Sequence, residues 1–370
     1  MSAQAQTSAP NLGMDVTTFE NPMGIDGFEF VEFAAPEGQG ARMRDYLEKL
    51  GFTAIAKHRK RAITLFRQGT INFLLNEEPD SFASDFAAQH GPSACGFAIR
   101  FRKSPDEVLE HVLAQGGEKA DHKAETGAVG FPAIKGIGDC MLYLVDDSAP
   151  DVYADYEPLP GVDQHPVGFG LTFIDHLTHN VIRGNMDTWY KFYHDTFNFR
   201  EIKYFDIKGK ATGLFSQAMI APDRAIRIPL NESQDENSQI EEFIRRYNGE
   251  GIQHIALGTD DIHASVEGMR AAGVEFLDTP DTYYELLPKR MPDAGEDIER
   301  LRRNRVLMDG APTPEGGRLL QIFTGTVIGP IFFELIQRKG DQGFGEGNFR
   351  ALFESIELDQ VRRGVLRAAE

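Results

Sequence analysis

Two histidines and one glutamate stand at places in the sequence where they could form a set of metal ligands. His176 lies in FIDHLTHNV, His254 in GIQHIAL and Glu334 in GPIFFELI, and all three segments are typical of short strands. An ionised glutamate among isoleucine, leucine and phenylalanine would be costly to bury unless a cation or hydrogen bonds compensated its charge. Two neutral imidazoles and one carboxylate on neighbouring strands would leave three adjacent positions open on a six-coordinate ion, as in non-haem Fe(II) oxygenases.

Other interpretations of these residues stay open at this point. A single histidine in a strand is more often a hydrogen-bonded core residue than a ligand. A ligand set without cysteine argues against a structural zinc site. His179 is three residues after His176, so on a strand it faces the opposite side and we expect it to be structural. The remaining histidines are expected on the surface, at positions 58, 90, 111, 122, 165, 194 and 263.

The sequence contains an internal repeat. Four strand-like runs are each followed by an amphipathic helical pattern and then by about three short alternating strands. The runs carry Gly27, Gly96, His176 and His254 at equivalent places, spaced by 69, 80 and 78 residues. This near-constant period indicates duplication, and only the second half has histidines at these places. The four runs are Ile25 to Phe33, Cys95 to Phe101, Phe173 to Val181 and Gly251 to Gly258.

The first of the four helices is expected to carry Met43, Leu47 and Leu50 on one face and to stop at Gly51, and the others are expected after Ser104, after Asn185 and after Asp261. Ser104, Pro105 and Glu107 form the pattern of a capping box with a proline in the first turn. The later strands are expected at Leu214 to Ile220, Ile226 to Leu230, Val306 to Met308, Leu319 to Phe323 and Ile331 to Ile336. By position in the repeat, the counterpart of Glu334 in the first half is approximately Tyr143.

A Pro- and Gly-rich segment from Tyr156 to Gly170 is the best candidate linker, which places a domain boundary near residue 160. The division is a polar tail over 1–20, a domain over 21–160 without metal, and a domain over 161–370 with the site. Near the end, glycines at 343, 345 and 347 precede Asn348, a potential N-cap, and an apolar stripe with Phe349 and Phe353. This pattern fits either a docked terminal helix or a lid that excludes water.

Composition narrows the choice of partners and compartment. The chain has 38 Lys+Arg against 57 Asp+Glu, a formal net charge of −19, which disfavours nucleic acid or an anionic membrane as a general partner. The apolar stretch Val327 to Ile336 is too short to span a bilayer. Two cysteines, and a start that lacks the pattern of a leader peptide, predict a cytoplasmic protein.

Six segments resemble the 4-hydroxyphenylpyruvate dioxygenase family of the vicinal oxygen chelate superfamily. They are FIDHLTHNV, FSQAMIAPDRAIRIPLNES, GIQHIAL, LLQIFT, GPIFFELIQRKG and GFGEGNFRALFESIE, in the order of the family. The resemblance implies an α+β fold with four βαβββ modules in two open barrels, a C-terminal lid helix, and a metal site only in the later barrel. It implies one Fe(II) per chain, held by His176, His254 and Glu334. The implied reaction converts 4-hydroxyphenylpyruvate and O2 to homogentisate and CO2 in the catabolism of tyrosine and phenylalanine.

In such a reaction the 2-oxo acid group of the substrate occupies two of the open positions on the metal and O2 takes the third. No added 2-oxoglutarate is then needed. The resemblance also implies further site residues. A polar set near the ring of the substrate comprises Ser216, Asn231, Gln239 and Gln253, Gln321 contacts the keto acid, Pro229 shapes the wall, and the packing aromatics are Phe323, Phe344, Phe349 and Phe353. Among these, Asn231, Gln253 and Gln321 are the candidate catalytic residues.

Gln253 directly precedes His254, so on a regular strand it would face away from the metal unless the backbone bends. Two rival functions also remain. 4-Hydroxymandelate synthase uses the same substrate and metal but hydroxylates the benzylic carbon, although IPLN and GFGEGNF look more like the dioxygenase. A metal-free protein of the superfamily would only bind a small molecule. In each case we expect a homo-oligomer, a dimer or a tetramer.

Overall fold

The computed structural model describes residues 19–120, 127–146, 151–208, 213–236, 238–292, 295–311 and 317–348. These residues belong to two compact units. The larger unit contains Phe19–Phe276 and Phe323–Leu335, and the smaller unit contains Leu277–Ile322 and the chain from Ile336 onward. The three candidate metal ligands all lie in the larger unit. The expected C-terminal lid helix lies outside the described residues.

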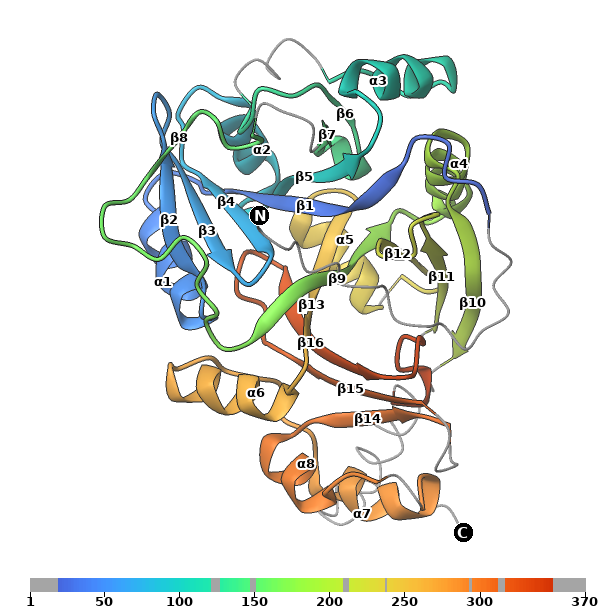
Figure 1. Ribbon diagram of the computed structural model, residues 1–370. Helices are drawn as coiled ribbons and strands as arrows, with labels where there is room; N and C mark the ends of the chain where they lie inside the picture. The colour runs from blue at the N-terminus through green and yellow to red at the C-terminus, as the bar shows by residue number, and fades with distance from the viewer. Residues whose placement is uncertain are drawn as a thin grey trace, which may run out of the picture. The chain divides into compact units, whose positions relative to one another are not determined.

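The first sheet lies entirely within the larger unit (Figure 1), and its described residues form eight strands. Its strand order is β6-β7-β5-β1-β4-β3-β2-β8. The central strand β1 pairs with β5 in antiparallel and with β4 in parallel. The strands are β1 (Ile25–Ala34), β2 (Thr53–His58), β3 (Ile63–Gln68), β4 (Ile71–Asn76), β5 (Ser93–Phe101), β6 (Ala133–Lys135), β7 (Met141–Asp146) and β8 (Tyr156–Pro158).

The second sheet repeats this plan in the later part of the chain. In the larger unit its order is β10-β11-β12-β9-β13-β16, and β9 pairs with β13 in antiparallel and with β12 in parallel. In the smaller unit β14 and β15 form an antiparallel pair. The strands are β9 (Leu171–Val181), β10 (Arg200–Lys208), β11 (Gly213–Ile220), β12 (Arg227–Ser233), β13 (Gly251–Thr259), β14 (Leu307–Gly310), β15 (Arg318–Phe323) and β16 (Phe332–Lys339).

The helices confirm all four helical predictions and add others. The four helices that were expected are observed as α1 (Gly40–Lys49), α3 (Pro105–Ala114), α4 (Met186–Phe197) and α6 (Ile262–Ala271). Ser104 and Glu107 form the predicted capping box, and Asp261 caps α6 with its side chain. The helices that we did not predict are α2 (Phe82–His90), α5 (Gln239–Tyr247), α7 (Asp281–Arg290), α8 (Ile298–Asn304) and the short 3-10 helix Ile137–Asp139.

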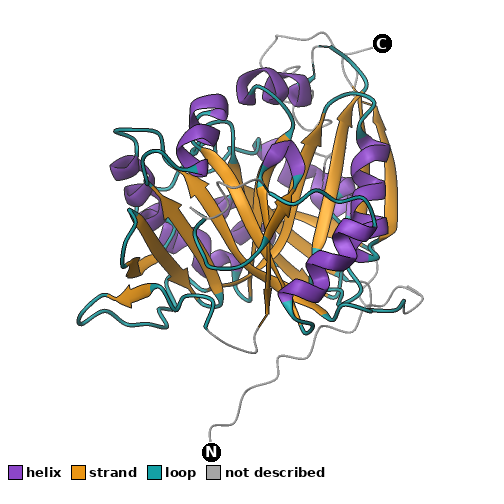
Figure 2. Ribbon diagram, turned by 90° about the horizontal axis from the view of Figure 1, so that it is seen from above, coloured by secondary structure: helices purple, strands orange, loops and turns teal. Residues whose placement is uncertain are grey.

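The order of elements confirms the modular repeat in the first, third and fourth modules, whereas in the second, β5-α3-β6-β7, two strands follow the helix among the described residues. The first and third modules are β1-α1-β2-β3-β4 and β9-α4-β10-β11-β12, and the fourth is β13-α6-β14-β15-β16 with α7 and α8 inserted. Within the larger unit α1 packs against β2 and β4, and α4 packs against β12. Helices thus lie against strands of both sheets (Figure 2). The last strand of the first sheet ends at Pro158 and the first strand of the second sheet begins at Leu171. The boundaries of the two compact units lie at other residues, so the domain boundary near residue 160 stays a prediction.

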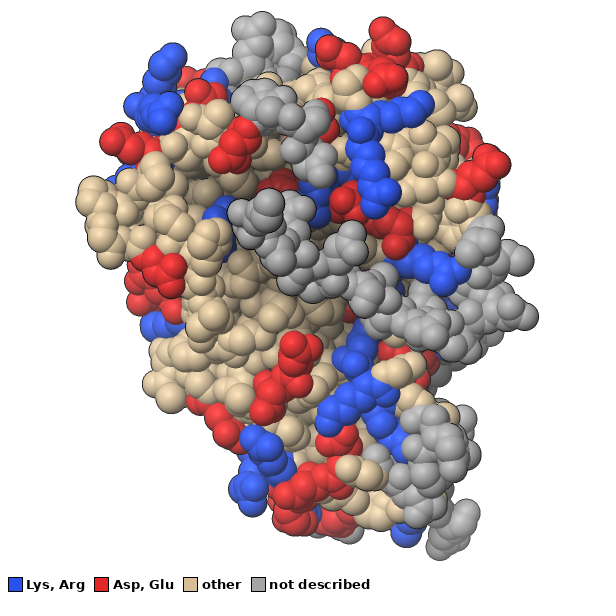
Figure 3. All heavy atoms as spheres, in the orientation of Figure 1, with Lys and Arg blue, Asp and Glu red and all other residues tan. Residues whose placement is uncertain are grey.

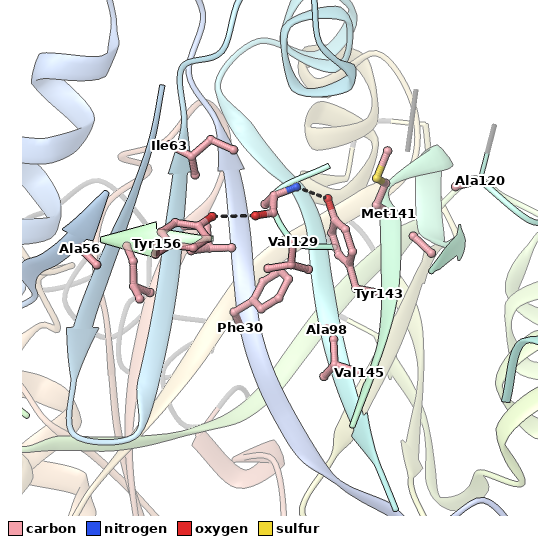
Figure 4. Close-up of a cluster of buried hydrophobic side chains, with 14 of the residues drawn as sticks. Phe30, Ala56, Ile63, Ala98, Ala120, Val129, Met141, Tyr143, Val145 and Tyr156 are labelled. Atoms are coloured by element: carbon pink, nitrogen blue, oxygen red, sulfur yellow. Dashed lines mark hydrogen bonds between the residues drawn. The ribbon is translucent and has the colours of Figure 1, made fainter. Parts of the chain in front are cut away.

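The interior beside the first sheet is filled by side chains (Figure 4). Ala128 and Val129 are buried in this cluster, and Ala128 bonds through its backbone to the hydroxyls of Tyr143 and Tyr156. The Tyr143 hydroxyl also donates to the fully buried Glu32, 2.7 Å away. Burial raises the pKa of this carboxyl. Packed side chains therefore fill the interior beside the first sheet, whereas the second sheet brings its histidines together.

The surface carries charges of both signs. On the face shown in Figure 3, described Lys and Arg side chains stand among Asp and Glu. None of the described helices is both long enough and apolar enough to cross a membrane.

Candidate metal centre

Three strands of the second sheet bring His176, His254 and Glu334 together. His176 and Glu334 are buried and His254 is half-buried. The two Nε2 atoms are 3.3 Å apart, and they lie 3.3 and 3.4 Å from Glu334 Oε2. Three donors about 2.1 Å from one ion, at right angles to one another, would be separated by about 3.0 Å. One ion can therefore be held by all three groups, and the donor types suit ferrous iron.

Two β-bulges shape the strands that carry the histidines. Across the β9–β13 pair, Ile252 faces His179 and His254 faces Thr178, which leaves Gln253 as an extra residue. Ala256 then faces His176 and Leu257 faces Ile174, which leaves Asp175 as an extra residue. A bulge turns side chains away from the regular alternation of a strand. Each bulge therefore lies directly before one candidate ligand.

The residue before each histidine contacts its Nδ1 atom, the ring nitrogen that does not face Glu334. His176 Nδ1 is 2.8 Å from Asp175 Oδ1, and His254 Nδ1 is 2.9 Å from Gln253 Oε1. The Nε2 atoms of both histidines therefore face the carboxylate of Glu334. Asp175 in turn lies 3.8 Å from the guanidinium of Arg227 on β12, and both side chains are buried.

The three groups perturb one another electrostatically. Burial alone would raise the pKa of Glu334, but the two imidazoles lower it to about 2. Burial alone would lower the pKa of His176, but the charge of Glu334 and the hydrogen bond of Asp175 raise it. Burial dominates at His254 and lowers its pKa. Glu334 is thus ionised at neutral pH and presents a negative charge to a cation.

An aromatic wall lies beside the half-buried histidine. The ring of Phe332 stacks on His254 with centroids 4.8 Å apart, and Phe323 meets the same imidazole edge-on at 6.5 Å. Phe323 was predicted as a packing aromatic, whereas Phe332 was missed. Phe332 is two residues before Glu334, so the alternation of a strand could have placed it on the same face.

The other expected substrate residues are distributed over several elements. Ser216 on β11 and Asn231 on β12 are partners across the strand pair, and both are half-buried. Pro229 on β12 is buried, and Gln239 is exposed at the first position of α5. Their roles stay predictions.

Two expected site residues lie in the smaller unit. Gln321 is buried and accepts a hydrogen bond from Asn348 Nδ2 at 2.8 Å, and the guanidinium of Arg338 lies over the ring of Phe344 at 5.8 Å. Phe349 and Phe353 lie outside the described residues.

Among the other histidines, His179 fits the structural role expected for it. It is fully buried, its Nε2 is 2.7 Å from the Tyr193 hydroxyl, and burial lowers its pKa to about 3. The surface prediction was wrong for His90 and His263, which are both buried. His90 packs on Tyr247 of α5, and its Nδ1 is 2.8 Å from the backbone carbonyl of that residue. The prediction for His90 failed because α5, whose Tyr247 packs on it, was not predicted.

Comparison with known proteins gives a consistent family. Residues 19–157 match the model described as "Hydroxyphenylpyruvate dioxygenase, HPPD, N-terminal". Residues 173–287 match the "Glyoxalase/Bleomycin resistance protein/Dioxygenase superfamily". The 4-hydroxyphenylpyruvate dioxygenase of Pseudomonas aeruginosa is 55% identical over 349 residues, which is 94% of this chain and 97% of that protein.

Two solved structures share the fold. One is a fusion of a xylose isomerase-like TIM barrel with 4-hydroxyphenylpyruvate dioxygenase, with a TM-score of 0.78, 32% identity, and 92% of this chain and 54% of that chain covered. The other is a mutant of 4-hydroxymandelate synthase from Streptomyces coelicolor, with a TM-score of 0.75, 27% identity and coverages of 91% and 99%. These likenesses bear out the vicinal oxygen chelate fold. With 55% identity to a relative over 94% of its own length, the chain belongs to the 4-hydroxyphenylpyruvate dioxygenase family.

Proposed function

We propose that this protein is an Fe(II)-dependent dioxygenase that converts 4-hydroxyphenylpyruvate and O2 to homogentisate and CO2, a step in the catabolism of tyrosine and phenylalanine. The observation that carries the proposal is the near full-length identity of 55% to a relative named for this activity. The convergence of two imidazoles and one carboxylate within 4.8 Å supports it independently.

His176, His254 and Glu334 would hold one Fe(II) per chain. When bound, the ion would accept the 2-oxo acid group of the substrate as a chelating ligand and would supply the redox chemistry for using O2, so no 2-oxoglutarate would be consumed. The chain contributes one carboxylate and two neutral imidazoles, which leaves one positive charge on the site to attract the anionic substrate. A protein with a net charge of −19 thereby binds an anion through its metal centre and needs no basic surface.

The residues around His176, His254 and Glu334, the trio of proposed ligands, would orient the substrate. Phe323 and Phe332 form an apolar wall that packs against the phenyl ring and excludes water. Ser216 and Asn231 are neighbours across β11 and β12 and can together orient the phenol. Additional assigned positions are Pro229 and Gln239 for the substrate, Gln253 and Gln321 for substrate and catalysis, and Phe344, Phe349 and Phe353 for packing.

The cellular setting forms part of the same proposal. Cys95 and Cys140 are free and buried, which fits a reducing compartment such as the cytoplasm. We propose a homo-oligomer, a dimer or a tetramer, that binds neither nucleic acid nor membrane.

Product analysis tests the proposal. The purified chain is loaded with Fe(II) without oxygen and mixed with 4-hydroxyphenylpyruvate and O2, while O2 uptake is recorded and products are separated by chromatography. We expect one homogentisate for each O2 consumed, and none with Glu334→Gln. 4-Hydroxymandelate as the product would support the synthase instead. The solved 4-hydroxymandelate synthase is 27% identical to this chain, against 55% for the dioxygenase of Pseudomonas aeruginosa. Substrate binding without O2 uptake would indicate a binding protein.

A further inference from the structure

The carboxylate of Asp175 lies between one candidate metal ligand and an arginine. Its Oδ1 is 2.8 Å from His176 Nδ1, and its Oδ2 is 3.8 Å from a guanidinium nitrogen of Arg227. Asp175 is 0% exposed and Arg227 is 4% exposed. Because a carboxylate only accepts hydrogen bonds, this contact places the proton of the imidazole on Nδ1 and leaves Nε2 with a free lone pair.

The backbone is bent at this aspartate. On a regular strand Asp175 would face away from His176, but it is the extra residue of the bulge between Ile174 and His176. The first half of the chain provides an internal comparison. There β1 also has one extra residue between Ile25 and Phe28, where Asp26 precedes Gly27. Asp26 is half-buried and forms ion pairs with arginines on β5 and after it.

A buried carboxylate is costly unless charge and hydrogen bonds compensate it. Asp175 has both kinds of compensation, on two different strands of the sheet. Carboxylates that accept from the second nitrogen of a metal-bound imidazole fix its tautomer and orientation, and their loss typically weakens metal binding 10- to 100-fold. The partner of His254 in the same position is the uncharged, half-buried Gln253.

We propose that Asp175 is a positioning residue that holds His176 with Nε2 toward the metal, and that Arg227 holds Asp175 in place. The inference rests on the proposed function, because it takes His176, His254 and Glu334 as the Fe(II) site. It assigns the stronger orienting partner to His176 and the weaker partner to His254.

The test is Fe(II) affinity, measured by anaerobic calorimetry on the full chain. Asp175→Ala alone would take from the buried Arg227 the carboxylate that it faces, so the informative variant is Asp175→Ala combined with Arg227→Met. We expect its Kd for Fe(II) to rise about 10- to 100-fold, with an unchanged Tm. Asp175→Asn keeps an acceptor oxygen and should lose less affinity, and Gln253→Ala should also lose less. Wild-type affinity in the double variant would overturn the proposal.

A second measurement separates this inference from the proposed function. In the metal-free protein, nitrogen NMR of labelled histidine reports which ring nitrogen of His176 carries the proton. We expect Nδ1–H in the wild type, and a mixture of tautomers in the double variant. If the wild type bound no Fe(II) but kept this single tautomer, the proposed function would fail while the positioning role stood. Nε2–H in the wild type would overturn the positioning role itself.

Discussion

At the scale of single residues, the side chains of the metal centre compensate one another's charges. Glu334 is buried among apolar residues, and the groups that hold its pKa at about 2 are the two imidazoles beside it. The trio could be predicted because the repeat placed histidine where the first half has glycine. Asp175 could not, because the alternation of a regular strand puts it on the wrong face and a bulge leaves no clear mark in the sequence.

Removal of a proposed ligand should empty the site without unfolding the chain. We expect His176→Ala and Glu334→Ala each to lower Fe(II) retention more than about 100-fold, because loss of a direct ligand should exceed the effect of an outer-shell change. Iron content after gel filtration and circular dichroism provide the two readouts. Glu32→Gln, at the buried glutamate beside the first sheet, is the matched control and should retain iron. Iron at wild-type content in either ligand variant would refute its assignment.

His179 should make the chain sensitive to acid. Its pKa falls from 6.5 to about 3 on burial, so between these values the unfolded chain binds a proton that the folded chain does not. The free energy of unfolding therefore falls as pH drops below 6.5, by up to about 1.4 kcal/mol per pH unit from this group. We expect His179→Gln to show a shallower decline in urea titrations between pH 4 and pH 7, whatever its stability at neutral pH. Parallel curves would contradict the assignment.

At the scale of elements, the two halves share a backbone plan and differ in what it carries. β5 has an extra residue at Cys95, directly before Gly96, just as β13 has one at Gln253 before His254. The duplicated bulges therefore exist where no ligand follows them. The sequence predicted the lead strands and their helices from periodicity. It did not predict α2 and α5, which precede β5 and β13. Their short apolar patterns lie between successive modules, in segments that the predicted repeat treats as connections.

The first sheet should contribute to stability and not to metal binding. Tyr143 donates to the buried Glu32 and accepts from the backbone of Ala128, so Tyr143→Phe removes one hydrogen bond from each of these two buried groups. We expect a loss of about 1–3 kcal/mol in the free energy of unfolding, with Fe(II) affinity unchanged. Tyr204→Phe, at a side chain that is 49% exposed, serves as the control and should change stability little. A loss of Fe(II) affinity in Tyr143→Phe would show that the halves are not independent in this respect.

At the scale of the whole molecule, an anionic chain acts on an anionic substrate. The net charge of −19 argues against a general basic surface, and on the face in Figure 3 the described Lys and Arg stand among Asp and Glu. If the metal centre captures the substrate, the long-range field of the protein opposes binding, and salt screens this opposition. We expect kcat/KM to stay constant or rise between 50 and 500 mM NaCl. A fall of several-fold would instead indicate capture by a basic surface.

The most direct measurement is anomalous diffraction at the iron edge from crystals of the chain loaded with Fe(II) under anaerobic conditions. The account predicts one strong peak per chain, about 2.0–2.2 Å from His176 Nε2, His254 Nε2 and a carboxylate oxygen of Glu334. A peak bound by other residues, or a trio that stays empty when iron is in excess, would contradict it.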